Sequence, residues 1–448
     1  MNEFRLILLL LLFSLEILAQ NKDKSKIGIQ EVVIVKSYSP SLNEVFKIKT
    51  NPRVPDSVYT SKKNVSYKIL NVPVISTFQP NKASPLKLKQ RKPSSAFNTI
   101  FSGAYGNKNQ LFLNVSNVTE IDRNQRFGIR FYKDGFSNNI NNTLLKSNQN
   151  YSDFGLNHNL RSSDYNVNTH FKFTSNINNY FGLISNSWDT FFLRNINPEI
   201  RRNNLKIRTH WNWYNFFLRS FEFQANITSD NFNTVEQQIA LKNNFDFDLG
   251  AGKLKGELKL FGFNTNFESS YYEKNILEFT QGLGAFDLLW QLYKNNFKIK
   301  IGAGASYILG VEKISNNLVY YPQVEFLYEK PGNILLPYLK GNGGVTLNTY
   351  SSLTKENPYL APTSNLIPSF SKYNLNIGIR SRLASVLNFD MGFIFDEIEN
   401  FDFFERLPFD NENNQISYRL SNSFQSNYLD TNLYGFKASI RIDLIKDN

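Results

Sequence analysis

The sequence predicts an all-β protein: a transmembrane antiparallel β-barrel of about 16 strands (about 14–18), preceded by an extended N-terminal periplasmic segment. Three observations predict it. Long stretches alternate apolar and polar residues, short and long connections follow one another in turn, and Phe and Tyr are abundant, at 40 and 23 residues. An aromatic-rich chain of low mean hydropathy suits a barrel with one lipid-facing and one polar face.

Composition narrows the class of protein. A globular chain of 448 residues would form two or three domains. The absence of Cys excludes disulfides and thiol metal sites. The net charge of +12 is spread along the chain without a basic block, so the sequence predicts no nucleic-acid partner.

Residues 1–19 are predicted to be a signal peptide. Arg5 precedes the apolar run "LILLLLLFSLEIL", and Ala19 supplies a small residue before Gln20. A single N-terminal anchor is the alternative. After Gln20 no stretch approaches the roughly 18 apolar residues of a transmembrane helix.

Residues 20–95 are predicted to be a proline-punctuated periplasmic segment, because proline at this density stops helices and limits sheets. Within "IQEVVIVKSYSPSL" lies a short strand-forming run. It has no neighbouring strand to pair with, so we expect it to dock on a partner protein by adding a strand to that partner's sheet. Its residues are Glu31, Val32, Val33, Ile34 and Val35.

Residues 96–448 are predicted to form the barrel. The clearest alternation covers residues 165–174, 205–213, 297–307, 387–395 and 434–444. Each of these runs reaches the roughly 9–11 tilted residues with which a strand crosses a bilayer. A soluble β-sandwich is the alternative, but its strands are usually shorter.

The connections predict the orientation. If the first strand, near residues 97–105, runs outward, the periplasmic turns include "EIDRN", "LRSSD", "LYKNN" and "SRLAS", all of which are short. The outer connections, such as "NTYSSLTKENPYLAPTSNLIPSFSK", are mostly long. Short periplasmic turns and long outer loops are typical of bacterial outer-membrane barrels, which have an even number of strands.

Basic residues mark the predicted lumen. If the apolar positions face lipid, the intervening positions face inward. One interpretation is a lumen that favours anionic solutes, because like charges in a channel focus an electrostatic field. The other is a wet lumen that tolerates mixed charge. The basic residues in question are Arg130, Lys172, Lys206, Arg208, Lys298, Lys300, Arg380 and Arg441.

No constellation predicts an enzyme, a cofactor or a metal site. His158, His170 and His210 lie in different predicted strands and lack metal-ligand spacing. The fragment "LGAGKLKG" lacks the spacing of a phosphate-binding loop, and a strand-to-strand turn explains its glycines.

Two segments carry a family resemblance. "EVVIVKSYSPSLNEVFKI" and "NTYSSLTKENPYLAP" resemble segments of Bacteroidota TonB-dependent-receptor-like outer-membrane barrels. In such receptors a similar Glu-Val-Val run lies at or near the energy-coupling box, and a plug domain follows it. Here only about sixty residues separate Val35 from Ala96. The resemblance therefore implies a receptor-like barrel without a plug domain.

Two functions follow as hypotheses. The first is a solute channel, receptor or transport-associated barrel in the outer membrane of a Gram-negative bacterium, in contact with membrane lipid. The alternative is a non-transport subunit of an outer-membrane complex for assembly, secretion or scaffolding. It would dock a periplasmic or outer-membrane protein partner through the N-terminal strand and the long outer loops.

Overall fold

The computed structural model describes residues 64–68 and 98–442, apart from 184–187, 189, 273–274, 312–316, 331–332, 383–386 and 412–414. The chain divides into two units, Met1–Leu88 and Lys89–Asn448. In the first unit, residues 64–68 are exposed and irregular. The expected signal peptide (1–19), the Glu31–Val35 run and the rest of the expected periplasmic segment lie outside the described residues.

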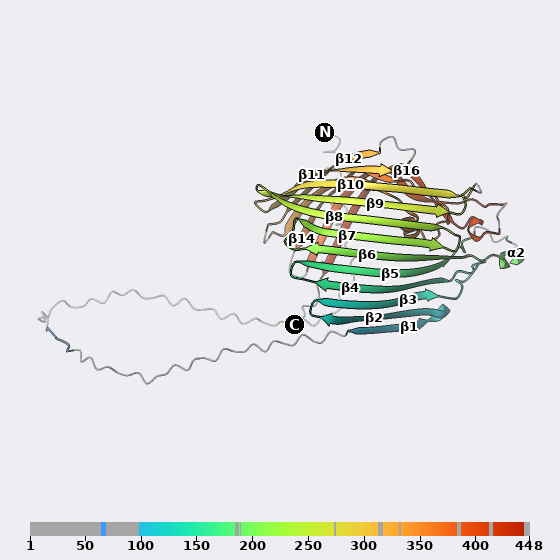
Figure 1. Ribbon diagram of the computed structural model, residues 1–448, viewed down its shortest axis with the longest axis horizontal. Coiled ribbons are helices and arrows are strands. Elements are labelled where there is room, and N and C mark those ends of the chain that lie inside the picture. Colours follow the sequence, from blue (N-terminus) through green and yellow to red (C-terminus); the bar gives the residue numbers. More distant parts are fainter. Residues whose placement is uncertain are drawn as a thin grey trace, which may run out of the picture. The chain divides into compact units, whose positions relative to one another are not determined.

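The second unit is a single antiparallel sheet of sixteen strands, each paired with its neighbours in sequence (Figure 1). The all-β barrel fold and the strand number expected from the sequence are thereby confirmed. The strands are β1 (Thr99–Gly106), β2 (Gln110–Asp122), β3 (Gln125–Phe136), β4 (Gln149–Arg161), β5 (Tyr165–Asn179), β6 (Glu199–Trp213), β7 (Leu218–Asp230), β8 (Val235–Leu249), β9 (Gly252–Phe267), β10 (Leu277–Lys294), β11 (Phe297–Leu309), β12 (Leu318–Tyr328), β13 (Leu335–Thr346), β14 (Ser369–Arg382), β15 (Leu387–Arg406) and β16 (Phe424–Ile442).

Connections of two kinds alternate along the sheet, as the sequence predicts. At one end, the short-turn end, strands are joined by tight turns such as Asn295–Asn296, where both residues have positive φ (49° and 68°). Positive φ at both central positions matches the right-handed twist of a hairpin, and Asn tolerates it. The opposite end, the loop end, carries long connections with two short helices, α2 (Thr190–Arg194) and α3 (Tyr350–Glu356).

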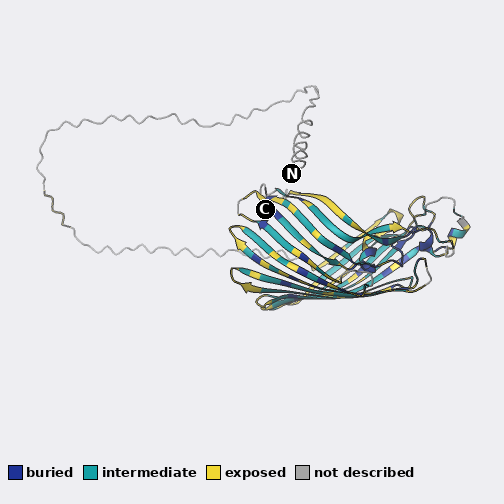
Figure 2. Ribbon diagram, turned by 90° about the horizontal axis from the view of Figure 1, so that it is seen from above, coloured by how far each residue is buried: buried dark blue, intermediate teal, exposed yellow. Residues whose placement is uncertain are grey.

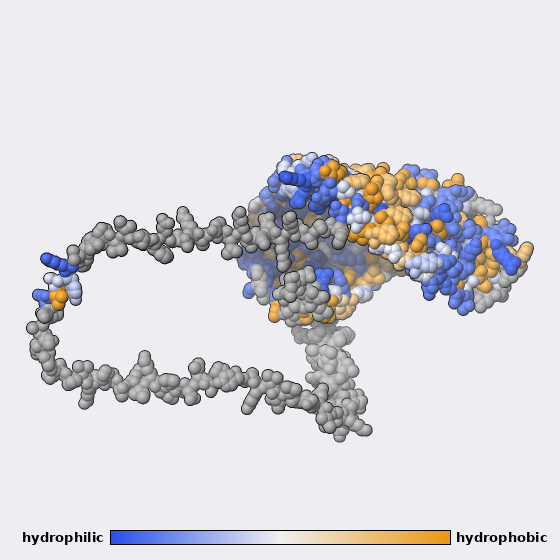
Figure 3. Space-filling model, turned by 90° about the horizontal axis from the view of Figure 1, so that it is seen from below, coloured by the Kyte–Doolittle hydropathy of each residue, from blue (hydrophilic) through white to orange (hydrophobic). Residues whose placement is uncertain are grey.

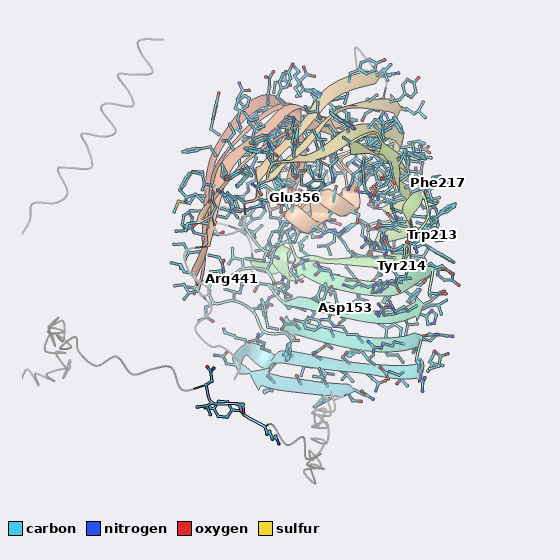
Figure 4. All side chains as sticks on the ribbon, turned by 90° about the vertical axis from the view of Figure 1, so that its left-hand side faces the viewer. Asp153, Trp213, Tyr214, Phe217, Glu356 and Arg441 are labelled. Carbon is cyan, nitrogen blue, oxygen red and sulfur yellow. The ribbon has the colours of Figure 1, made fainter. Side chains whose placement is uncertain are left out.

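The two faces of the sheet differ in polarity. On the outer face, Phe131, Phe154 and Phe173 are direct register partners and each is about two-fifths exposed. Figure 3 shows the resulting apolar band on the barrel surface, bordered by hydrophilic residues. Trp213 and Phe217 lie at the short-turn end (Figure 4), where aromatic residues commonly mark a membrane interface.

No helix in the described part of the chain is long and apolar enough to cross a membrane.

The buried core lies inside the loop end of the sheet and not between layers (Figure 2). It is built largely from the described residues of five connections at this end, within residues 137–148, 180–198, 268–276, 347–368 and 407–423. We call these five connections the cap. A transmembrane barrel has no apolar interior of its own when its inner face is polar, so the cap supplies the apolar cluster.

The sheet is not closed, since β1 and β16 do not pair with each other among the described strands. This differs from the expectation that the barrel closes on itself. The free edge of β16 is used by the cap: Phe424 donates its N–H to the Tyr359 carbonyl (3.1 Å) and accepts from the Ala361 N–H (2.7 Å). At this position the β13–β14 connection binds backbone groups on the free side of β16.

Candidate functional site: a lumen closed by its own loops

The β13–β14 connection (347–368) folds into the lumen and begins helix α3 there. Thr349 and Ser352 form a capping box, in which Ser352 N–H donates to Thr349 Oγ1 at 3.1 Å. Such caps satisfy backbone N–H groups that have no partner inside a helix. Figure 4 shows α3 within the curve of the sheet, with Glu356 labelled at its C-terminal end.

Glu236 of β8 binds the same helix end from the barrel wall. Its side chain is fully buried, and its carboxylate accepts from the N–H groups of Tyr350 (2.6 Å) and Ser351 (2.9 Å). Thr265 Oγ1 and Gln238 Nε2 each donate to it at 2.7 Å. A buried charge is tolerated when it is fully hydrogen-bonded, and a helix N-terminus favours a negative one. Glu236 therefore fixes α3 to the luminal wall.

Arg202 of β6 holds the other side of the loop. Its buried guanidinium donates to the carbonyls of Pro358 (2.6 Å) and Leu360 (2.7 Å) and to the Tyr350 hydroxyl (3.1 Å). The Tyr350 hydroxyl in turn donates to Asp230 at 2.7 Å. Burial raises the pKa of Tyr350 well above its usual value, so this hydroxyl stays protonated and remains a donor.

Arg419 anchors a second inward loop, the β15–β16 connection. It donates to the carbonyls of Tyr271 (2.6 Å) and Ser270 (3.0 Å) in the β9–β10 connection. It also pairs with Asp410 at 2.6 Å. The planar guanidinium suits this arrangement because it presents several donors in one fixed fork. Arg419 therefore ties two loops of the cap together.

Apolar packing completes the cap. Leu353 and Tyr350 of α3 pack with Phe263 and Phe267 of β9, and the rings of Tyr350 and Phe267 meet edge to face at 5.3 Å. A second cluster places Tyr180 against Tyr418. Buried apolar side chains and buried charges together fill part of the interior at the loop end.

Cavities with charged walls lie along the lumen. One of them, about 870 Å³, is lined from β7 to β15 by residues of both signs, among them Lys259 and Asp287. Asp287 accepts from the Tyr321 hydroxyl at 2.8 Å and from Gln323 at 2.5 Å. Charges on this wall are thus satisfied by one another and by polar neighbours.

Another cavity, about 470 Å³, is lined by strands β2 to β6. Four of the basic residues singled out from the sequence meet here: Arg130, Lys172, Lys206 and Arg208. Asp153 is the one carboxylate among the residues that line it. We call it the basic cavity.

The other four singled-out bases lie elsewhere. Lys298 and Lys300 are on β11, where Lys300 pairs with Glu325 at 2.6 Å. Arg380 and Arg441 line a separate cavity of about 600 Å³ near the ends of β14 and β16, and Arg380 pairs with Asp390 at 3.1 Å. The structure therefore does not bring all eight predicted luminal bases together.

Sequence reasoning missed the anchors Arg202, Glu236 and Arg419. Arg202 and Glu236 have the same parity as Lys206 and Lys242 on their strands, so extending the alternation beyond the membrane-length runs would have placed them inward. Arg419 lies in a loop without periodicity, and only the tertiary contacts reveal it.

No group of three His, Asp or Glu side chains among the described residues could hold a metal ion. The His210 ring contacts Glu222 at 3.3 Å and Asn212 at 2.9 Å.

No family profile matches the sequence, and no curated protein matches it. Solved structures do resemble the fold. The siderophore receptor PirA from Pseudomonas aeruginosa is 13% identical with a TM-score of 0.52, covering 78% of this chain and 63% of its own. The FrpB iron transporter from Neisseria meningitidis (F5-1 variant) is 9% identical with a TM-score of 0.54, covering 76% and 59%. A mutant ferric enterobactin receptor, PfeA, from Pseudomonas aeruginosa is 9% identical with a TM-score of 0.53, covering 78% and 59%.

At these identities the likeness concerns the fold alone, which is that of an outer-membrane β-barrel. The chain spans about 60% of the length of the solved structures that it matches.

Proposed function

We propose that this chain is an outer-membrane barrel of the receptor or transport type, whose own loops close its outer mouth and open to admit a solute. The observation that carries the proposal is the cap, in which buried Arg202 and Glu236 on the barrel wall hold the β13–β14 loop inside the lumen. The likeness to a siderophore receptor and an iron transporter supports a receptor-type barrel in a Gram-negative outer membrane.

Opening would have to separate these anchors from the loop. Arg202 and Glu236 each make several hydrogen bonds to the loop. Each of these bonds that is broken without a replacement costs about 1–3 kcal/mol. A solute that offers equivalent hydrogen bonds would lower this cost. Occupancy and opening would then be coupled, because a ligand shifts an equilibrium by its differential affinity for the two states.

Conductance in planar bilayers tests the proposal. We expect the full chain to conduct poorly and a variant lacking residues 349–361 to conduct severalfold better, because that deletion removes α3 and both anchored segments. Deleting residues 140–146 from a different cap loop is the matched control and should have a smaller effect. If the 349–361 deletion inserts and folds but still does not conduct, the transport function is wrong.

One observation favours a second candidate, a subunit that docks a partner protein. The β1 and β16 edges are unpaired with each other in the described sheet, and their outward residues Phe101 and Phe436 are 71% and 63% exposed. Lipid offers no hydrogen-bonding partner to an open strand edge, so an added strand would satisfy it. A strand of a partner protein fits this role.

Photo-crosslinking from the strand edges tests the second candidate. A crosslinker at position 101 or 436 should reach a second polypeptide in the native membrane if a partner strand fills the edge. A crosslink that joins only β1 to β16 of the same chain contradicts partner docking at this edge and supports self-closure.

A further inference from the structure

Like charges face each other across two strands of the luminal wall. Lys172 of β5 is the direct register partner of Lys206 of β6. Arg208 lies on the same face, two residues further along β6, opposite His170. Like charges placed directly opposite each other destabilise a sheet, so their presence calls for a compensating negative charge.

The protein supplies only part of that charge. Asp153 lies 3.5 Å from Lys172, and Glu222 lies 2.7 Å from Arg208. Within the described residues, Arg130 and Lys206 contact no carboxylate. The Arg130 guanidinium lies instead 5.2 Å from the centre of the Tyr132 ring, which holds it in place without neutralising it.

The cavity of about 870 Å³ shows that this imbalance is not a general property of the lumen. Its wall carries a near balance of the two signs, with Arg219, Lys255 and Lys259 against Asp246, Glu257, Asp287 and Asp396. The basic cavity has four bases, besides His170, against one lining carboxylate. The excess of positive charge is therefore larger in the basic cavity than in the cavity near the ends of β14 and β16, where Arg380 and Arg441 face Asp390.

The wall is also hollowed between the bases. Gly155 of β4 lies between Arg130 of β3 and Lys172 of β5 in the register of the sheet. Gly128 lies two residues before Arg130 on β3 and faces the same side. A Cβ at position 155 would meet nothing closer than 3.8 Å, so the space above this glycine is open. The cavity of about 470 Å³ lies over this part of the wall.

A fifth base approaches from the cap. Lys355, on the last turn of α3, is near enough to Lys206 for the two charges to act on each other, and its side chain is exposed. Its charge therefore adds to the positive potential at Lys206 from the helix that Glu236 and Arg202 hold in the lumen.

We propose that the basic cavity binds a solute carrying two or more phosphate or carboxylate groups. The planar guanidinium of Arg130 matches such oxyanions, and Lys206 adds a point charge that no described carboxylate contacts. Lys172 and Arg208 border the cavity while paired with Asp153 and Glu222. Low-dielectric walls strengthen the attraction. This inference deepens the proposed function. It rests on that function in one respect, namely that the solute reaches the cavity through the lumen.

Equilibrium binding to the full chain in detergent tests the proposal, with pyrophosphate and citrate as probes at constant ionic strength. We expect both to bind, and orthophosphate to bind more weakly because it offers a single group. Lys206→Gln and Arg130→Gln should each weaken pyrophosphate or citrate binding by about tenfold or more, which is the loss of one charge-assisted contact.

Lys242→Gln is the matched control. Lys242 also faces the lumen, but Glu257 already pairs with it at 2.7 Å, so the substitution should leave probe binding unchanged. Heat-modifiable mobility in gels verifies that each variant is folded. Equal losses in all three variants, or no binding of either probe by the folded chain, would overturn the proposal.

The measurement does not depend on transport. Probe binding by a chain that never conducts, even without residues 349–361, would reject the transport function and keep the site. Conductance without probe binding would keep the transport function and reject the site.

Discussion

Arg202 of β6 donates a hydrogen bond of 2.7 Å to the backbone carbonyl of Leu360, 158 residues further along the chain, inside the barrel. The contact makes the barrel wall and the inward loop a single structural unit. It also places a permanent positive charge where no solvent reaches it, so the loop carbonyls compensate that charge as long as the cap is closed.

Arg202→Lys should loosen the cap while retaining the charge. Lysine cannot reproduce the planar fork that binds Pro358, Leu360 and Tyr350 together, so we expect opening to become easier by about 2 kcal/mol. Trypsin cleavage after Lys355, in the same loop, measures opening and should become at least tenfold faster.

The neighbouring Arg201→Lys variant is the control. Arg201 points away from the loop and pairs with Glu199 at 2.9 Å on a largely exposed surface, so cleavage should stay at the wild-type rate. Equal acceleration in both variants would mean that Arg202 does not anchor the loop.

Glu236→Gln should weaken the start of α3. An amide has one acceptor oxygen where the carboxylate has two, so one of the Tyr350 and Ser351 N–H groups loses its acceptor, at a cost of about 1–3 kcal/mol. Amide hydrogen exchange in residues 350–356 should therefore accelerate about tenfold or more.

Glu268→Gln provides the comparison for this position. Glu268 lies just after β9 at the same end of the barrel and accepts from Asn233 at 2.6 Å at an exposed position. Exposed substitutions of this kind change stability by about 0.5 kcal/mol or less. Exchange in α3 that responds equally to both variants would contradict the anchoring role of Glu236.

Gly302→Ala should impair folding of the barrel. A Cβ at position 302 of β11 would overlap the carbonyl oxygen of Leu288 on β10 and come within 2.8 Å of the Leu289 Cα, and neither is a side chain that could move aside. We expect most of the protein to run as the unfolded form in heat-modifiability gels, since such overpacking costs about 1–3 kcal/mol or more. Gly155→Ala, whose Cβ meets open space, should fold normally.

Deleting Glu31–Val35 should leave barrel insertion intact and abolish partner binding. The run precedes the sheet and is expected to dock on another protein by strand addition. Membrane fractionation measures insertion, and co-purification in mild detergent measures binding. Lost insertion, with partner binding in vitro unaffected, would contradict this role.

Periodicity along single strands predicted most of the fold. The run 165–174 lies within β5, and residues 387–395 begin β15, because side chains alternate across a sheet wherever the two faces meet different surroundings. The strands extend past the membrane-length runs at the loop end, where β15 reaches Arg406. The alternation of apolar and polar residues is weaker at this end, because neither face of the strand contacts lipid and both contact protein or water.

The candidate site could be predicted only in part. Alternation placed Arg130, Lys172, Lys206 and Arg208 on one face, and that parity is enough to bring them together once the strands are neighbours. It could not separate them from Lys300, which has the same parity but lies on β11 beside Glu325. The register of adjacent strands decides which basic residues have no carboxylate partner. That register cannot be read from a single sequence.

The sequence by itself determined the sixteen-strand antiparallel sheet, its alternating short and long connections, and the polarity of its two faces, because each of these follows from near neighbours along the chain. Only the tertiary structure decided that the long loops turn inward. Arg202 and Glu236 find their partners more than a hundred residues away, and a buried charge is stable only where those partners converge.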